Sequence, residues 1–343
     1  MSLEPTESAE NRASSQSSWR SWLGRLGPLL ALVLVTFGFA IADQIWGQGR
    51  FIDIRNARVI LVEAAPVAVA ALGMTLIIMT GGIDLSAGTA SILCATVLAI
   101  SLNANQPVSV AVSASVVTGG LCGLFNGLII GILRLPPFIV TLGSMTIFLG
   151  IAKHLANSST VFVERGRIPE WLLKFTSTEP PQWVGLMPNI PSGVWFALVI
   201  SVVVAVVLSL TVFGRHVLAV GSNESTARLC GVNVFTTKLT VYALAGVLFG
   251  IAGLYSFSLL KMANPGEGIG KELKFIAAVV IGGGSLSGGR GSVLGTLAGA
   301  AIMCVISSGC SQLGVVNATQ DIMIGVIIII AVSIDQLRNR KQD

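Results

Sequence analysis

Charged residues are scarce in this chain of 343 residues: they make up 11% of it, whereas hydrophobic residues make up 53%. Soluble domains carry about a quarter charged residues, so this composition excludes an ordinary soluble protein. Mean hydropathy is +0.83, and apolar runs long enough to cross a bilayer as helices recur along the chain. The sequence therefore predicts an all-α polytopic membrane protein.

Residues that hold metals or carry out catalysis are equally few. The chain has 2 histidines and 5 cysteines without paired spacing, and no His-Glu-x-x-His motif, so we expect no metal site. A phosphate-binding G-x-x-x-x-G-K-[S/T] loop and a G-x-S-x-G nucleophile elbow are also missing. The net charge of +5 is scattered in short polar breaks, which argues against nucleic acid as a partner. We expect no catalytic residues and no cofactor.

The two ends of the chain are polar. Residues 1–25 are rich in Ser, Glu and Arg without apolar periodicity, which predicts a disordered leader. The apolar run 26–42 that follows is read as the first span, although its flanks also resemble a signal peptide that would be cleaved. At the other end, residues 338–343 are expected to form a short tail.

Between these ends, residues 26–337 are predicted to form one transmembrane domain with about ten spans. The expected spans are 26–42, 64–82, 86–103, 108–133, 138–153, 191–214, 239–260, 275–284, 291–311 and 321–335. The stretch 275–284 is too short to cross alone and runs into glycines, which predicts a discontinuous helix. The polar stretch 153–191 is expected to be a loop without a catalytic domain.

A polar stretch, 215–238, lies between two charge-free runs. Ser222 or Asn223 can cap a helix start, Glu224 suits the positive end of the helix dipole, and Gly231 suits a left-handed stop. The sequence therefore predicts a helix of about two turns between two spans.

The surface of this short helix suggests two roles. Glu224 and Arg228 are four residues apart and can form an ion pair. Ala227, Cys230 and Gly231 would give a face of small residues that another surface can approach closely. From spacing alone, a docking element and an ordinary capped loop helix are equally compatible with the pattern.

Two polar residues stand out inside the apolar runs. Asp84 lies with Ser86 between glycines and has no basic neighbour in sequence, so it either caps the next helix or faces a cavity. Asn126 lies deep in a span and needs a buried partner or a wet pathway, and a helix–helix hydrogen bond and a pore-lining role are equally compatible. The glycine-rich stretches 81–88 and 282–289 are similar, which hints at an internal repeat.

Six motifs in order resemble the ribose-type sugar permeases of bacterial ABC importers. They are Gly82-Ile83-Asp84-Leu85-Ser86-x-Gly88, Asn126-Gly127, Pro137-Phe138-Ile139-Val140-Thr141-Leu142-Gly143, Phe213-Gly214-Arg215-His216, Gly221-x-Asn223-Glu224-x-x-Ala227-Arg228-x-x-Gly231-Val232-Asn233 and the 282–295 stretch. Each motif is weak alone, but the resemblance runs in order from about 64 to 335.

The resemblance implies a fold similar to the vitamin-B12-type importers, with ten helices per subunit. It implies a permease in the bacterial inner membrane that pairs with a second permease copy and carries ATPase subunits, often a tandem ATPase, that bind the ATP. A periplasmic solute-binding protein would deliver the sugar or sugar-like cargo. The stretch 215–238 then matches the family's coupling helix, with Gly221, Asn223, Glu224, Ala227, Arg228 and Gly231 as its contact residues.

The same resemblance suggests where the solute passes and how the chain is oriented. The residues expected along the path are Asp84, Ser86, Asn126, Phe138, Thr141 and Ser285. Lys271 and Lys274 would face the external mouth. Lysine and arginine are divided almost evenly between the two sides, so charge does not orient the chain, and the resemblance alone places both termini in the cytoplasm.

Two other classes of protein remain as alternatives. A secondary transporter would use Asp84 as its ion-coupled carboxylate. An intramembrane enzyme would need a cluster of carboxylates or histidines on facing helices, and the sequence offers almost none.

Overall fold

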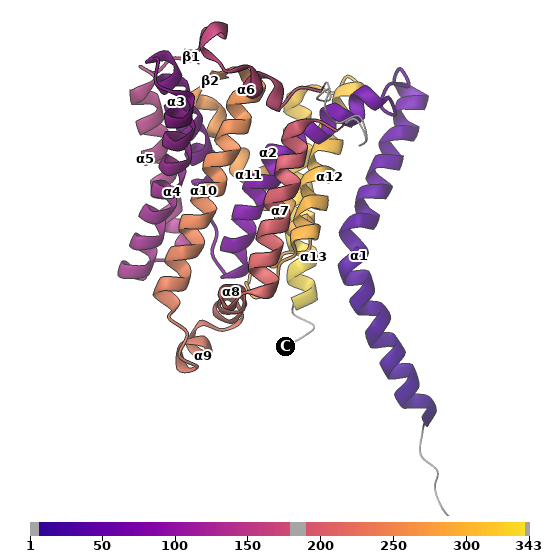
Figure 1. The fold of residues 1–343 in the computed structure, drawn as a ribbon. Coiled ribbons are helices and arrows are strands. Elements are labelled where there is room, and N and C mark those ends of the chain that lie inside the picture. The colour runs from indigo at the N-terminus through magenta and orange to yellow at the C-terminus, as the bar shows by residue number, and fades with distance from the viewer. Residues whose placement is uncertain (1–6, 179–189, 340–343) are drawn as a thin grey trace, which may run out of the picture.

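The computed structural model describes residues 7–178 and 190–339, and nearly all of its regular structure is helical (Figure 1). The α-helices are α1 (Glu7–Trp46), α2 (Ile54–Met79), α3 (Ala87–Asn103), α4 (Val108–Leu133), α5 (Pro137–Leu155), α6 (Glu170–Phe175), α7 (Ser192–Leu210), α8 (Val212–Ser222), α9 (Glu224–Leu229), α10 (Val234–Leu260), α11 (Lys271–Ile281), α12 (Val293–Gln312) and α13 (Asn317–Asn339). The remaining elements are β1 (Val161–Phe162), β2 (Met262–Ala263) and the 3-10 helices η1 (Arg165–Arg167) and η2 (Pro265–Gly268).

The all-α multi-pass prediction is confirmed. Within the described residues, 7 helices are long and apolar enough to cross a membrane: the part of α1 from Leu26 onward, α2, α4, α5, α7, α10 and α12. Helices α3 and α13 contain shorter apolar stretches. Helix α11 has only 11 residues, as expected for the interrupted span 275–284.

The helix that forms in the expected sixth span, 191–214, is shorter than this charge-free run. Helix α7 ends at Leu210, and Thr211 then caps α8 by accepting a hydrogen bond from the Gly214 N–H. Helix α8 buries every third residue, Gly214, Val217 and Val220, so it has one apolar face. It therefore packs along the end of the bundle instead of continuing the span (Figure 1).

The centre of the bundle is built on α2, α10 and α12, whose most apolar windows are 72%, 61% and 72% buried. Helices α4 and α10 cross at glycines. A Cβ on Gly123 would overlap the Tyr242 carbonyl oxygen, and one on Gly246 would overlap the Gly119 carbonyl oxygen. This is the small-residue packing by which membrane helices bring their backbones close together.

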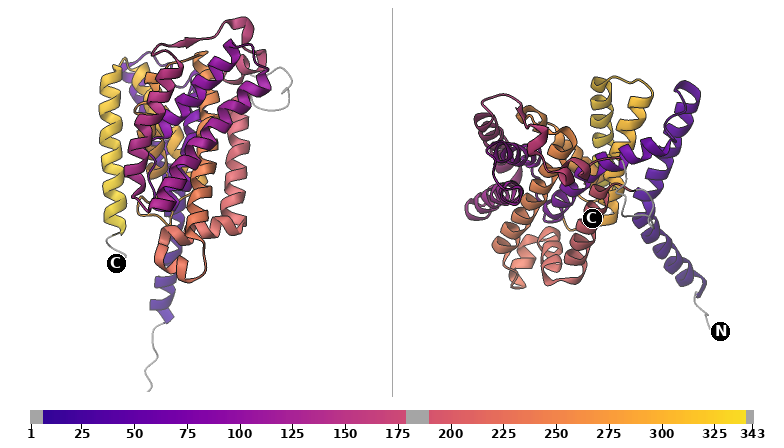
Figure 2. Two further views of the ribbon diagram at one scale, coloured as in Figure 1. Left: turned by 90° about the vertical axis from the view of Figure 1, so that its left-hand side faces the viewer. Right: turned by 45° about the horizontal axis from the view of Figure 1, so that its top comes forward.

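Helix α1 lies at the edge of the bundle, and only 11% of its apolar window is buried. It packs on α12, and Figure 2 shows it standing apart from the remaining helices. Its C-terminal end is fixed because the Asp43 carboxylate accepts hydrogen bonds from the N–H groups of Gln48 (3.2 Å) and Phe51 (2.7 Å).

Residues 7–25 belong to α1, where the sequence predicts a disordered leader. Extending an existing helix costs far less than starting one, so the polar residues continue the helix that the apolar run forms. Residues 1–6 lie outside the described part of the chain. The expected tail 338–343 is shortened, because α13 continues to Asn339.

The two ends of the bundle differ. At one end the loop 153–191 carries β1, η1 and α6, and β1 pairs with β2 in antiparallel register, with Val161 opposite Ala263. Helices α8 and α9 lie at the opposite end, together with the N-terminal part of α1 and the end of α13 (Figure 1).

Candidate functional site

Asp84 is the centre of a buried polar cluster between α2 and α3. Its Oδ1 accepts hydrogen bonds from the N–H (2.7 Å) and the hydroxyl (2.6 Å) of Ser86. Its Oδ2 accepts one from Asn126 Nδ2 at 3.3 Å, and the same amide nitrogen donates to Ser86 Oγ at 2.9 Å. Asp84, Ser86 and Asn126 are each 1% exposed.

This cluster joins three helices. Asn126 comes from α4, and Thr141 from α5 accepts a hydrogen bond from the Leu85 N–H at 3.1 Å. Thr141 also donates to the Ile83 carbonyl at 3.2 Å. Of the two roles left open for Asn126, the structure therefore has the interhelical hydrogen bond. Asp84 shapes the turn that leads into α3, but the capping role is not observed, because its carboxylate accepts only from Ser86 and Asn126 and the N-cap residue Ser86 makes no side-chain capping bond.

Two of the six residues expected along the solute path lie away from the Asp84 cluster. Phe138 is 52% exposed at the start of α5, on the outer face of the bundle. Ser285 is buried in the glycine-rich segment 282–291, where its N–H donates to the Arg290 carbonyl at 3.2 Å. The remaining four, Asp84, Ser86, Asn126 and Thr141, are together but closed to solvent.

Tyr242 on α10 is a polar neighbour of this cluster that the sequence analysis missed. A Cβ added at Gly82 would lie 2.7 Å from the Tyr242 hydroxyl, and this hydroxyl and Asn126 Oδ1 are buried without a hydrogen-bond partner. A buried polar atom without a partner is costly and rare. The only available signal was that tyrosine occurs just 2 times in the chain.

Helix α9 has the start and stop that the sequence predicts. The Asn223 side chain accepts a hydrogen bond from the Thr226 N–H at 2.8 Å, and Gly231 has φ +84° after the last turn. Glu224 pairs with Arg228 at 3.0 Å, as expected, and also with Lys238 of α10 at 2.6 Å. The hydrogen bond from Lys238 lowers the pKa of the Glu224 carboxyl below its ordinary value. The pair with Lys238 attaches α9 to α10.

The outer face of α9 differs from the predicted face of small residues. Ala227 is 4% exposed and packs against Val220 and Val234, so it faces the protein. Leu229, in contrast, is 89% exposed. The prediction for Ala227 was wrong because the register of so short a helix is set by its tertiary contacts with α8 and α10, which spacing does not reveal.

Gly221, near the end of α8, lies in a junction of three backbone segments. A Cβ on Gly221 would overlap the Met79 carbonyl oxygen at the end of α2 and would lie 2.6 Å from the Gly289 nitrogen. The Gly289 N–H donates to that same Met79 carbonyl at 3.0 Å. We call these contacts among Met79, Gly221 and 288–289 the glycine junction.

The two glycine-rich stretches that resemble each other in sequence also meet at this junction. A Cβ on Gly288 would lie 2.9 Å from the Gly81 nitrogen and 2.6 Å from the Gly221 carbonyl oxygen. The breaks after α2 and after α11 are therefore neighbours. An internal repeat stays a prediction.

Within residues 7–178 and 190–339, no group of three or more His, Cys, Asp or Glu side chains is placed to hold a metal ion. The four ion pairs of that part of the chain all lie in exposed or loop regions. The features that can act on a partner or a solute are thus α9, the glycine junction and the cavities of the bundle.

Comparison with known proteins gives the class of this chain. A family profile described as "Branched-chain amino acid transport system / permease component" matches residues 56–332, which cover the bundle from α2 into α13. The chain belongs to this family and is a multi-pass membrane permease component of a transport system.

Particular relatives are sugar permeases. The chain is 36% identical over 295 residues to the ribose import permease protein RbsC of Escherichia coli, covering 85% of this chain and 88% of that protein. It is 34% identical to the fructose import permease protein FrcC of Rhizobium meliloti (90% and 84% covered) and 33% identical to RbsC of Bacillus subtilis (92% and 94% covered). No solved structure gives a significant match.

The polar cluster generates a prediction about stability. Asp84→Ala removes three hydrogen bonds and leaves the N–H and hydroxyl of Ser86 buried without their acceptor, which costs about 1–3 kcal/mol for each orphaned group, whereas Asn126 can still donate to Ser86. Asp84→Asn keeps an oxygen that can accept from Ser86. We expect thermal unfolding of the purified protein in detergent to show a much lower Tm for Asp84→Ala than for Asp84→Asn. Equal Tm values would contradict the assigned hydrogen bonds.

Proposed function

We propose that this chain is the permease subunit of an ATP-driven importer that moves a sugar or sugar-like solute into the cell. The family membership and the ribose and fructose permeases among its relatives support the transport role. ATP would bind to separate ATPase subunits, either single or tandem, because the sequence has no phosphate-binding loop. A periplasmic solute-binding protein would deliver the cargo.

The observation that carries the proposal is the position of α9. It lies beyond the ends of α4, α7 and α10 (Figure 1), presents Leu229 outward and is attached to α10 by the Lys238–Glu224 pair. The glycine junction joins Gly221, near the end of α8, to the end of α2 and to the segment after α11. A push on α9 by an ATPase can therefore reach two helices of the bundle. We assign Gly221, Asn223, Glu224, Arg228 and Gly231 to this coupling element, with Leu229 in place of Ala227 as its outward contact.

Orientation follows from the same assignment. An ATPase works in the cytoplasm, so the end of the bundle that carries α9 faces the cytoplasm of a bacterial inner membrane. Both chain termini then lie on the cytoplasmic side, because the N-terminal part of α1 and the end of α13 are at that end (Figure 1). The loop 153–191, with β1 and α6, faces outward and would meet the solute-binding protein.

A second permease copy and membrane lipid would cover the outer helices. Helices α4 and α5 are only 33% and 28% buried in their most apolar windows, and α5 exposes Phe138, Ile139 and Leu142. We propose that the solute passes between two copies along this face, so Phe138 lies on the path. Asp84, Ser86, Asn126 and Thr141 bind one another in this conformation and would reach the solute only if the cluster opens.

The rival is a secondary transporter that uses Asp84 as an ion-coupled carboxylate. Against it, Asp84 is 1% exposed and both of its oxygens accept hydrogen bonds from protein groups. When the chain is reconstituted with the ATPase and the solute-binding protein that are encoded beside it, the vesicles should take up solute only with ATP, and vanadate should stop uptake. Uptake that ignores both ATP and vanadate would favour the secondary transporter.

Leu229 provides a sharper test of the coupling element. Leu229→Glu puts a charge at the proposed centre of the ATPase contact, and central apolar contacts carry much of the energy of an interface. We expect stimulation of the ATPase and solute uptake to fall by about tenfold or more, with Tm unchanged because Leu229 touches little of its own chain.

Phe162→Glu is the matched control, since Phe162 is also an exposed apolar residue (71%) but lies at the opposite end of the bundle. It should leave ATPase stimulation at the wild-type level. Wild-type stimulation and uptake by Leu229→Glu would count against α9 as the coupling element.

The glycine junction can be tested by adding one methyl group. Gly221→Ala introduces a Cβ that overlaps the Met79 carbonyl oxygen, so the junction has to separate. We expect a large loss of uptake, because the end of α8, which leads into α9, loses its close contact with α2. Gly325→Ala is the control, since a Cβ there meets nothing within 4 Å. Equal uptake by the two variants would exclude the junction from force transmission.

A further inference from the structure

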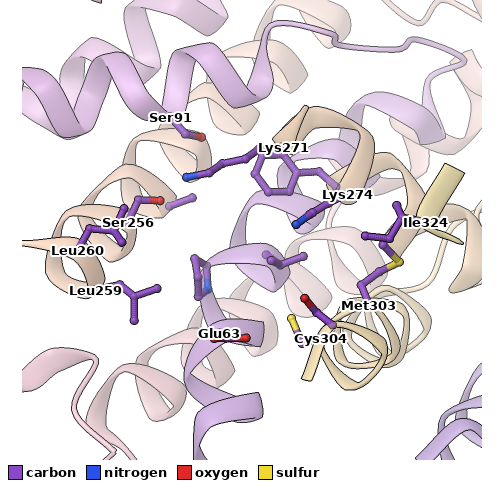
Figure 3. A pocket seen from close by; sticks show the side chains of 15 residues that line it. Glu63, Ser91, Ser256, Leu259, Leu260, Lys271, Lys274, Met303, Cys304 and Ile324 are labelled. Atoms are coloured by element: carbon purple, nitrogen blue, oxygen red, sulfur yellow. The ribbon is translucent and has the colours of Figure 1, made fainter. Parts of the chain in front are cut away.

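A cavity of about 200 Å³ lies inside the bundle, away from the Asp84 cluster (Figure 3). Its walls come from α2, α3, α10, α11, α12 and α13. They are Glu63, Pro66, Val67, Ser91, Ala252, Ser256, Leu259, Leu260, Lys271, Lys274, Phe275, Met303, Cys304, Ser307 and Ile324. Most are apolar, but two lysines and one glutamate are among them.

The two lysines are attracted by carboxylates, Lys274 by Glu63 and Lys271 by Glu267, but neither forms an ion pair with them. Lys271 and Lys274 are three residues apart, on one face of α11, and Figure 3 shows both side chains extending into the cavity, with Glu63 on the far wall. With ion pairs counted up to 4.0 Å, the described residues form four, and none includes Lys271, Lys274 or Glu63. Both lysines lie in the first two turns of α11, which follows β2 and η2, and the expectation that they face the external mouth stays a prediction.

Two half-buried ammonium groups without a paired anion are unfavourable in a surrounding of low dielectric constant. Among the side chains that line the cavity, the single carboxylate of Glu63 leaves one positive charge in excess. A bound anion would satisfy both ammonium groups with charge-assisted hydrogen bonds, which are about twice as strong as neutral ones. The chemistry of the cavity therefore favours a ligand with one negative charge.

The other residues of the cavity wall indicate which further groups such a ligand carries. Ser91, Ser256 and Ser307 supply hydroxyl groups that can donate or accept, and Phe275 supplies an apolar surface. Hydroxyl groups in the ligand would match the serines. The volume is below the ~300–1,000 Å³ of pockets for drug-sized ligands, so the ligand is small.

We propose that this cavity binds a small hydroxyl-bearing anion, with Lys271 and Lys274 holding its carboxylate or phosphate group. Two sources share this chemistry: a sugar acid from the aqueous phase, and the phosphoglycerol headgroup of an anionic lipid. The site goes beyond the proposed import function and does not depend on it, because binding can be measured on the permease alone.

The test uses the full chain in nanodiscs of phosphatidylcholine, titrated with D-gluconate and with the uncharged polyol D-glucitol. We expect gluconate to bind and to raise Tm, and glucitol to have no effect. Lys271→Met and Lys274→Met should each weaken gluconate binding by about tenfold or more, since each removes a charged donor. Lys153→Met, at an exposed position on α5, is the control and should bind as the wild type does.

Glu63→Gln gives a result of opposite sign. It removes the one negative charge of the wall, so the anion should bind several-fold more tightly, which a merely structural role of Glu63 would not produce. It also keeps the proposal testable if a lysine variant fails to fold.

A second arm distinguishes the lipid source. Native mass spectrometry after purification from phosphatidylglycerol membranes should show a retained phosphatidylglycerol that Lys271→Met loses, if the headgroup is the ligand. Gluconate binding without retained lipid assigns the site to the aqueous anion. If neither anion binds, or if both bind to the folded lysine variants and to Glu63→Gln as to the wild type, the proposal is wrong.

Discussion

The contact on which this structure most depends joins backbone to backbone at the glycine junction. The Met79 carbonyl at the end of α2 has lost its partner within the helix, and the Gly289 N–H supplies a new one at 3.0 Å. Gly221 can lie against both atoms only because it has no side chain. Since a membrane interior offers no water to bared backbone groups, interrupted helices must satisfy one another, and here they do so next to α9.

Helix α11 links the charged cavity to the glycine junction. Its first turn carries Lys271 and Lys274 into the cavity, and its last residue leads into the segment that meets Gly221. Eleven residues span about 16 Å at 1.5 Å per residue. The short helix α11 thus connects the charged cavity directly to the segment at the glycine junction.

Local signals in the sequence were sufficient for some features and insufficient for others. Caps and stops act within a few residues, so Asn223, Gly231 and the Glu224–Arg228 pair could be predicted for α9. The inward direction of Ala227 and the contact of Asp84 with Asn126 depend on segments distant in the chain. The break at Thr211 rests on a local hydrogen bond with Gly214, which the charge-free run did not reveal. Asn126 was recognisable as a residue that needs a partner, but nothing in its neighbourhood named Asp84. Tyr242 gave almost no signal because an aromatic ring in an apolar run is ordinary.

The sparse packing of α1 has a consequence for how the protein is made. Its main neighbour in the bundle is α12, which a ribosome completes some 250 residues later. Until then α1 has to reside in lipid without α12. Its apolar stretch of 21 residues is long enough to span the bilayer alone, and only 11% of its most apolar window is buried even in the finished protein. The Asp43 turn that joins α1 to α2 needs only residues already synthesised. Helix α1 can therefore be held against the start of α2 long before α12, on which it finally packs, has been made.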